Sequence, residues 1–255
     1  MKTVILAGGY GLRFSEFTQS KPKPMAMIGG YPIILHIMNI YMKYGYNEFL
    51  IAAGYKSEVI KDYFINYKYL NSDIEIDMRN GEYKIIGKKN NLDWNIKIIE
   101  TGKNSLTAKR VFKLKKYLKN ERFFLTYGDG LSNINIKKTL AFHQKQKKIC
   151  TLTAVRPNLR FGEIKINSKN IITKFNEKKQ LSDGWINGGF FICEPEVFNF
   201  IDNNNEMFEK GPLQKLVKNK QLSSYKHESF WQCMDNKREY DYLNELYSSK
   251  NCPWA

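Results

Sequence analysis

The residues best suited to chemistry lie in a short glycine-rich loop near the start of the chain. The stretch LAGGYGLRF places Gly8, Gly9 and Gly11 after an apolar run and adds Arg13. Because glycines carry no Cβ atom, a nucleotide could approach their backbone N–H groups closely. Arg13 supplies a planar, permanently charged fork suited to a triphosphate. Ten residues later, Lys23 lies between two prolines whose fixed φ angles restrict its ammonium. The pattern predicts a phosphate-binding loop.

Two better-known phosphate-binding motifs do not fit this loop. The dinucleotide fingerprint G-x-G-x-x-G requires a third glycine, for close packing of helix and strand, where Phe14 stands. A P-loop requires G-x-x-x-x-G-K-[ST], and the stretch GEYKIIGKK fails in its spacing and its last residue. The remaining interpretation is a phosphate-binding loop at the end of a strand, with the cations Arg13 and Lys23 beside it.

Two aspartates far apart in the sequence are candidate metal ligands. Asp129 lies in TYGDG, where Gly128 and Gly130 leave room for an ion, and Asp235 ends the stretch FWQCMD. Magnesium prefers oxygen ligands and keeps several waters, so one or two protein carboxylates plus phosphate oxygens suffice. Taken alone, each aspartate would more often be a turn former or a helix cap.

Histidines and cysteines give no sign of nucleophilic catalysis. His36, His143 and His227 form no recognisable triad with a reactive serine or cysteine, and His36 lies in a predicted helix, where we expect a structural role. The four cysteines are far apart and show no C-x-x-C spacing. We therefore expect free thiols in a reducing cytoplasm and no structural zinc.

Composition indicates a globular cytoplasmic protein. In 255 residues, 42% are hydrophobic, no apolar run reaches the roughly 20 residues of a membrane span, and no secretory signal is evident. The formal net charge of +16 raises nucleic acid as an alternative partner, but only seven of the 41 basic residues are arginine. The lysines are dispersed rather than gathered into arginine-rich stripes with stacking aromatics. Solvated lysines, or attraction of an anionic substrate, are favoured over a nucleic-acid-binding module.

Apolar runs alternate with helix-period segments, which is typical of βαβ units. The sequence thus predicts an α/β, Rossmann-like fold with a mostly parallel central sheet flanked by helices, and a smaller β-rich acceptor region. We expect a single domain over 1–255, with a nucleotide-binding half (1–130) and an acceptor-binding half (131–255). Expected strands include TVILAGG, EFLIAAGY, RFFLTYGDG and ICTLTAVRP, and GEIKIN pairs with IITKFNE through the turn NSKN.

The pattern LAGGYGLRF…PKPM resembles the signature of the nucleoside-diphosphate-sugar pyrophosphorylases, a nucleotidyltransferase superfamily. The likeness continues through nearly the whole chain, and FLTYGDGLSNINI, RFGEI, INGGFFICEPEVFNFID, GPLQKL, FWQCMD and CPWA are similar to the glucose-1-phosphate cytidylyltransferase branch. The resemblance implies the nucleotidyltransferase fold. It also implies a Mg²⁺-dependent reaction of CTP with a phosphorylated acceptor, which gives a CDP-linked product and pyrophosphate.

Matching motifs carry the family's residue roles onto this sequence. Arg13 and Lys23 are the implied catalytic residues, at the pyrophosphate portion and near the α-phosphate, and Asp129 and Asp235 are the implied metal ligands. The implied nucleotide-binding residues are Leu6, Ala7, Gly8, Gly9, Gly11, Arg13, Lys23, Thr107 and Arg110. A catalytically silent copy of the fold should have lost one of the four catalytic or metal residues, so catalysis is favoured.

Acceptor binding is implied for a second set of residues. FNEKK looks like the family's E-K-P segment, in which Glu177 and Lys178 match and Lys179 replaces the proline. Lys178 is then the implied partner of the acceptor phosphate. Asn187 and Gly188, in WINGGFF, stand where family members line the acceptor pocket. On composition alone, Lys178 could be another solvated lysine.

One stretch departs from the cytidylyltransferase branch. Its T-G-G-R reads Thr107-Ala108-Lys109-Arg110 here, and Cβ atoms with an ammonium would narrow the site and add positive charge. We therefore expect an acceptor with its own carboxylate, paired by Lys109 or Lys179. L-glutamine phosphate, used by the similar CTP:phosphoglutamine cytidylyltransferases of capsule phosphoramidate synthesis, is the candidate. The alternatives are glucose 1-phosphate as acceptor and Lys109 as a solvent-facing lysine. Relatives often form homo-oligomers, which is a further expectation.

Overall fold

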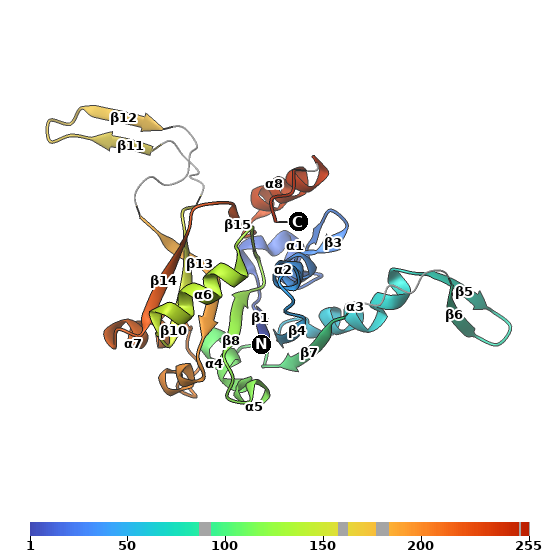
Figure 1. The fold of residues 1–255 in the computed structure, drawn as a ribbon. Helices are drawn as coiled ribbons and strands as arrows, with labels where there is room; N and C mark the ends of the chain where they lie inside the picture. Colours follow the sequence, from blue (N-terminus) through green and yellow to red (C-terminus); the bar gives the residue numbers. More distant parts are fainter. Residues whose placement is uncertain (87–92, 158–162, 177–183, 250, 255) are drawn as a thin grey trace.

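A seven-stranded β-sheet forms the centre of the molecule (Figure 1). The computed structural model describes residues 1–86, 93–157, 163–176, 184–249 and 251–254. Across the sheet, the strands are β14 (Leu222–His227), β10 (Cys150–Val155), β13 (Ile186–Cys193), β8 (Phe123–Tyr127), β1 (Thr3–Ala7), β4 (Glu48–Ala53) and β7 (Asn95–Glu100). Strand β13 is antiparallel to both of its neighbours, whereas the other pairs are parallel. The predicted α/β class with a mostly parallel sheet is confirmed.

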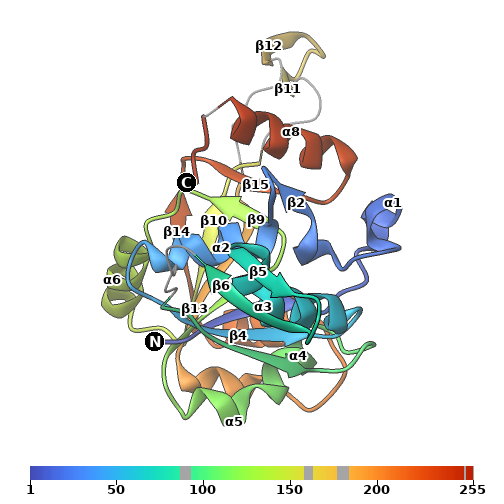
Figure 2. The same cartoon turned by 90° about the vertical axis from the view of Figure 1, so that its right-hand side faces the viewer.

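Helices cover both faces of this sheet. The α-helices are α1 (Ser15–Thr18), α2 (Ile33–Met42), α3 (Ser57–Leu70), α4 (Thr107–Lys113), α5 (Lys115–Leu118), α6 (Ile136–Gln146), α7 (Pro212–Lys218) and α8 (Lys237–Ser248). Short 3-10 helices are η1 (Leu12–Phe14), η2 (Lys23–Met25) and η3 (Pro195–Phe200). In Figure 2, α4 and α5 lie on the opposite side of the sheet from α8.

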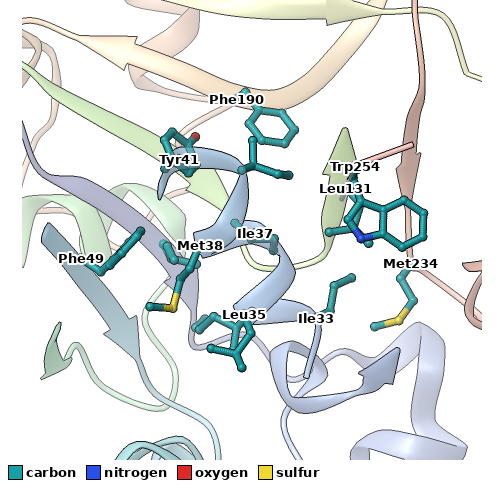
Figure 3. Close-up of a cluster of buried hydrophobic side chains, with 14 of the residues drawn as sticks. Ile33, Leu35, Ile37, Met38, Tyr41, Phe49, Leu131, Phe190, Met234 and Trp254 are labelled. Carbon is teal, nitrogen blue, oxygen red and sulfur yellow. The ribbon is translucent and has the colours of Figure 1, made fainter. Parts of the chain in front are cut away.

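The alternation of side chains along β1 explains the two apolar cores. Ile5 and Ala7 join a cluster built around α2, whereas Val4 and Leu6 join a second cluster under α4 and α5. Because successive side chains of a strand point to opposite faces, a fully apolar strand must be covered on both sides. Figure 3 shows the α2 side, where residues from several strands and from the C-terminal segment surround the helix.

A buried histidine ties the C-terminal segment into the first core. The ring of Trp254 is almost fully buried, and its Nε1 donates to Nδ1 of His36 at 3.2 Å. The other ring nitrogen of His36 donates to the Ile28 carbonyl at 2.9 Å. Both nitrogens are therefore used within the fold, as expected for a structural histidine, and burial lowers the pKa of His36.

Small two-stranded sheets complete the fold. They are β2 (Met27–Ile28) with β3 (Tyr31–Pro32), β5 (Asp73–Asp77) with β6 (Glu82–Ile86), β9 (Gly130–Ser132) with β15 (Trp231–Cys233), and β11 (Glu163–Ile166) with β12 (Ile172–Asn176). The β5–β6 and β11–β12 hairpins project from opposite ends of the molecule (Figure 1). The β9–β15 pair matters most for function, because it joins the end of β8 to the segment that precedes α8.

The central sheet takes strands from both predicted halves of the chain. Strands β1, β4, β7 and β8 precede residue 130, and β10, β13 and β14 follow it. The division into a nucleotide-binding half and an acceptor-binding half stays a prediction. In the described parts of the chain, none of the helices combines the length and the apolar character needed to cross a membrane.

Candidate active site

A cavity of about 630 Å³ opens at the carboxyl ends of β1 and β8. In α/β sheets, ligands bind at this edge because loops from several parallel strands meet there. The volume is within the usual range for a small-molecule site. Its lining residues are Leu6, Ala7, Gly8, Gly9, Tyr10, Gly11, Leu12, Lys23, Pro24, Lys103, Asn104, Ser105, Leu106, Thr107, Arg110, Tyr127, Gly128, Asp129, Met207 and Glu209.

The cavity brings together most of the predicted nucleotide-binding residues. Eight of the nine contribute to its lining, although Thr107 and Arg110 are about a hundred residues from the glycine loop in sequence. The ninth is Arg13. Its backbone belongs to η1, and its side chain lies outside the described part of the structure. Asp129, a predicted metal ligand, lies in the same cavity.

Backbone conformation fixes the shape of the glycine loop. Gly11 has φ +63°, a left-handed conformation that residues with a Cβ atom rarely adopt. Its carbonyl accepts hydrogen bonds from the Phe14 amide at 2.9 Å and from the Thr18 hydroxyl at 3.3 Å. A Cβ atom on Gly8 would lie 2.2 Å from the Arg110 guanidinium. The loop therefore needs glycine at these two positions for different reasons.

Arg110 is buried against the glycine loop and hydrogen-bonds to it. It is 3% exposed, and its guanidinium donates to the carbonyls of Gly8 at 2.7 Å and Gly102 at 2.9 Å, and to the Thr101 hydroxyl at 2.6 Å. Burial lowers the pKa of Arg110, while Tyr10 and Glu100 oppose this shift. The Arg110 guanidinium thus links α4 to the glycine loop and to residues 101–102. Most of its N–H groups are used in hydrogen bonds within the protein. Arg110 therefore positions the loop.

Lys23 lies between the two predicted metal ligands. Its Nζ is 2.7 Å from Asp129 Oδ2 and 2.5 Å from Asp235 Oδ1, and the lysine side chain is 12% exposed. Burial lowers the pKa of Lys23, but the charges and hydrogen bonds of the two aspartates outweigh it, so the pKa is raised. The Lys23 ammonium consequently stays charged at neutral pH.

Hydrogen bonds of the backbone bring the two aspartates together. β9 and β15 pair Gly130 with Cys233, and the Met234 amide donates to the Asp129 carbonyl at 2.9 Å. The amide of Asp235 donates to Glu239 at 2.5 Å. Asn236 caps α8 by accepting from the Glu239 amide at 3.1 Å. The helix cap and the small sheet together direct Asp235 toward Asp129.

The donor set at this point fits a magnesium ion. Two carboxylates converge on one cationic group, the Lys23 ammonium, at hydrogen-bond distance. Carboxylate oxygens are the protein ligands that Mg²⁺ prefers, and Mg²⁺ commonly takes only one or two of them. The described residues contain no cluster of three or more His, Cys, Asp or Glu side chains suited to a metal. Substrate phosphates and water would therefore have to complete the coordination.

Two further cavity residues were not predicted from the sequence. The Tyr127 hydroxyl donates to Glu209 and accepts from Asn187 Nδ2 at 3.1 Å, while the Thr107 hydroxyl donates to Glu209 at 3.0 Å. Burial, followed by the nearby Glu209 carboxylate, raises the pKa of Tyr127. The sequence signal was weak, since Glu209 belongs to no motif of its own and only precedes the stretch GPLQKL by two residues.

The structure corrects the expectation drawn from Ala108 and Lys109. Ala108 is fully buried in the second apolar core, and the Lys109 ammonium donates to the backbone and side chain of Asn203. Neither residue lines the cavity. Successive helical residues point about 100° apart, so only Thr107 and Arg110 of this stretch reach the site. The predicted narrowing of the site by residues 108 and 109 is wrong.

The remaining predicted acceptor residues fall into two groups. Glu177, Lys178 and Lys179 lie outside the described residues. Asn187 contacts the cavity through Tyr127, and the Gly188 carbonyl accepts from Trp231 Nε1 at 2.7 Å. A Cβ atom on Gly188 would come within 2.7 Å of Val155, so β13 and β10 approach closely here. Their roles in acceptor binding stay predictions.

Comparison with known proteins supplies independent evidence. The model of the family described as "Nucleotidyl transferase" matches residues 2–238. The chain is 41% identical to "Probable glucose-1-phosphate cytidylyltransferase" of Bacillus subtilis, over 100% of this chain and 99% of that protein. It is 42% identical to "Glucose-1-phosphate cytidylyltransferase" of Salmonella typhimurium, over 100% and 98%. A solved UDP-glucose pyrophosphorylase in complex with UDP-glucose has the same fold, with a TM-score of 0.67, 21% identity, and 98% of each chain covered.

Proposed function

The chain belongs to the nucleotidyl transferase family, and we propose that it transfers the cytidylyl group of CTP to a phosphorylated small molecule, releasing pyrophosphate. Family membership makes the protein a nucleotidyltransferase. The choice of CTP is supported by relatives named as cytidylyltransferases, which align over nearly their full lengths. The observation that carries the proposal is the convergence of Lys23, Asp129 and Asp235 beside the glycine loop.

The reaction needs no activated serine, cysteine or histidine. An oxygen of the acceptor phosphate is already anionic near neutral pH, and it forms a bond to the α-phosphorus of CTP. The bond from the α-phosphorus to the bridging oxygen breaks, and pyrophosphate leaves with the electron pair. The protein's task is to align the two phosphates and to neutralise negative charge.

The site divides this task among a few groups. Backbone N–H groups at Gly8, Gly9 and Gly11 would face the nucleotide, and Arg13 would contact the pyrophosphate portion. Lys23 would lie near the α-phosphate, where its ammonium can offset charge on the attacking and leaving oxygens. Its pairing with two carboxylates holds the ammonium beside the cavity.

Asp129 and Asp235 would hold Mg²⁺. When bound, the ion would neutralise the phosphate oxygens and polarise the α-phosphoryl group as a Lewis acid. The carboxylates are held by β9, β15 and the cap of α8, so their spacing is set by the fold.

Two acceptors are candidates. Glucose 1-phosphate is supported by the names of the relatives at 41–42% identity. L-glutamine phosphate, which would place the enzyme in capsule phosphoramidate synthesis, is favoured by the charges of Arg156 and Lys226 beside Trp185. A neutral sugar does not call for these two cations. Assembly into a homo-oligomer stays a prediction.

Pyrophosphate release tests the proposal directly. Wild-type protein with Mg²⁺ should release pyrophosphate from CTP faster than from UTP or GTP when glucose 1-phosphate or L-glutamine phosphate is supplied. Lys23→Met should lower kcat about 10²–10³-fold. Lys21→Met removes an exposed lysine of the same KPKP stretch and should leave kcat unchanged. No release with any nucleotide, or equal rates for both variants, would contradict the proposal.

A further inference from the structure

Two cations share one indole ring at the end of the central sheet. Arg156 directly follows β10, Trp185 directly precedes β13, and Lys226 lies in β14. The guanidinium carbon of Arg156 is 4.6 Å from the centroid of the Trp185 ring, and Nζ of Lys226 is 5.5 Å from it. Both distances are within the range of cation–π attraction. The indole therefore lies within cation–π distance of two positive charges.

These two charges have no anionic partner in the described parts of the chain. Neither Arg156 nor Lys226 forms an ion pair with a described carboxylate, including the nearby exposed Glu228. The Nε atom of Arg156 is buried and lacks a hydrogen-bond partner. Buried donors are nearly always satisfied in folded proteins, so a donor of this kind is suited to an incoming acceptor group. The chemistry of the cluster is that of an anion-binding subsite.

Strand register places the cluster on the face that leads to the cavity. Ala154 of β10 pairs with Asn187 of β13 on one side and with Lys226 of β14 on the other. Directly opposite residues share a face of the sheet, and so do residues two apart along a strand. Arg156 therefore shares the face of Ala154, and Trp185 shares the face of Asn187.

Asn187 connects this face to the nucleotide cavity. Its side chain donates to the hydroxyl of Tyr127, which lines the cavity together with Asp129. Trp185 is two residues before Asn187, which corresponds to about 7 Å of extended chain. An acceptor whose phosphate lies near Asp129 would extend past Asn187 toward the indole.

We infer that Arg156, Trp185 and Lys226 bind a carboxylate of the acceptor, at the end remote from its phosphate. The inference rests on the proposed function, since it assigns the far end of the same substrate. The guanidinium fork suits the two oxygens of a carboxylate, and the indole holds the fork beside it. The acceptor phosphate is not the group bound here, because it must reach the α-phosphorus beside Lys23 and Asp129.

Steady-state kinetics with two acceptors test the subsite. Arg156→Met and Lys226→Met should each raise the KM for L-glutamine phosphate about tenfold and leave the KM for CTP unchanged. Their KM for glucose 1-phosphate, which has no carboxylate, should stay within about twofold of wild type. Arg156→Lys should restore part of the loss, because it keeps the charge but not the fork. Lys218→Met removes an exposed lysine of α7 as the matched control.

Each other outcome overturns the inference. An equal rise in KM for both acceptors would mean that the cluster holds the phosphate, and unchanged kinetics would mean that it binds neither. A wild-type enzyme that uses glucose 1-phosphate but not L-glutamine phosphate would also overturn it. Failure of the wild type to release pyrophosphate with either acceptor would instead contradict the proposed function. If Arg156→Met does not fold, the Lys226→Met variant tests the inference, because Lys226 is exposed.

Discussion

The charged side chains at the nucleotide end of the site are paired with one another, whereas those at the proposed acceptor end are not. At the nucleotide end, the Lys23 ammonium meets the carboxylates of Asp129 and Asp235 within 2.7 Å. At the proposed acceptor end, Arg156 and Lys226 lie against an indole and pair with no described carboxylate. Lys23, Asp129 and Asp235 pair with one another, and their fixed geometry would serve any substrate of the reaction. Arg156 and Lys226 have no such partner among the described residues, so in this proposal they select the substrate by binding its charge.

Removing a carboxylate at the nucleotide end should have the largest effect. Asp129→Asn keeps the shape of the side chain but takes away one charge beside Lys23, and we expect kcat to fall about 10²–10³-fold. The fall should be the same with glucose 1-phosphate and with L-glutamine phosphate. Pyrophosphate release measures it, with the exposed Asp62→Asn as control. A loss confined to one acceptor would break the division between the ends.

Loss of the cation under the glycine loop should be the next largest effect, and it should appear in stability. Arg110→Met removes the charged hydrogen bonds to the Gly8 and Gly102 carbonyls and to the Thr101 hydroxyl, so the free energy of unfolding should fall by roughly 3 kcal/mol. Urea unfolding followed by circular dichroism measures this fall. Arg79→Met, on the exposed β5–β6 hairpin, should stay within about 0.5 kcal/mol of wild type. Similar losses in both variants would contradict the positioning role.

Glu209 lies between the two ends and can show whether they are coupled. Its carboxylate accepts from Thr107 and from Tyr127, which in turn bonds Asn187. Glu209→Gln replaces one acceptor oxygen by a donor, so the KM for CTP and the KM for the phosphorylated acceptor should both rise roughly tenfold. The exposed Glu196→Gln is the control. A rise in only one KM would assign Glu209 to that end, and no rise in either would exclude a role in binding.

A small contribution to the pH dependence of stability should come from His227. Burial lowers the pKa of His227, which follows Lys226 in β14, whereas no histidine is among the described residues that line the nucleotide cavity. Below about pH 6.5 the unfolded chain takes up a proton that folded His227 resists, so stability is lost as the pH falls toward the lower folded pKa. Between pH 7.5 and 5.5, wild type should lose up to about 1 kcal/mol more than His227→Asn in urea unfolding. His36→Asn, in the apolar core, gives the comparison for a histidine remote from the site. Equal losses in wild type and His227→Asn would contradict this effect.

Much of the fold could be predicted because periodicity and glycines mark it locally. The run TVILAGG predicted β1 and the loop after it, and the turn NSKN predicted the β11–β12 hairpin. The structure contains both. The alternation of apolar runs with helix-period segments predicted the mostly parallel sheet. The antiparallel direction of β13 had no local signal, because it depends on long connections rather than on any residue within the strand.

The site residues that lie in recognisable motifs could be predicted from the sequence. Lys23, Asp129 and Asp235 lie in three recognisable stretches, and the structure places them together. Glu209 was missed because a single carboxylate between other elements forms no pattern. The orientation of Lys109 could not be read either, since the helical phase that turns it toward Asn203 depends on how α4 packs.

The contacts of Lys23 also bear on the order in which the protein becomes functional during synthesis. The lysine is made early, Asp129 follows 106 residues later, and Asp235 follows 212 residues after the lysine. A chain emerging from the ribosome N-terminus first therefore exposes its nucleotide loop long before the second carboxylate exists. Such a nascent chain lacks half of the proposed metal ligands, so it would be unable to consume CTP until its last helix had left the exit tunnel.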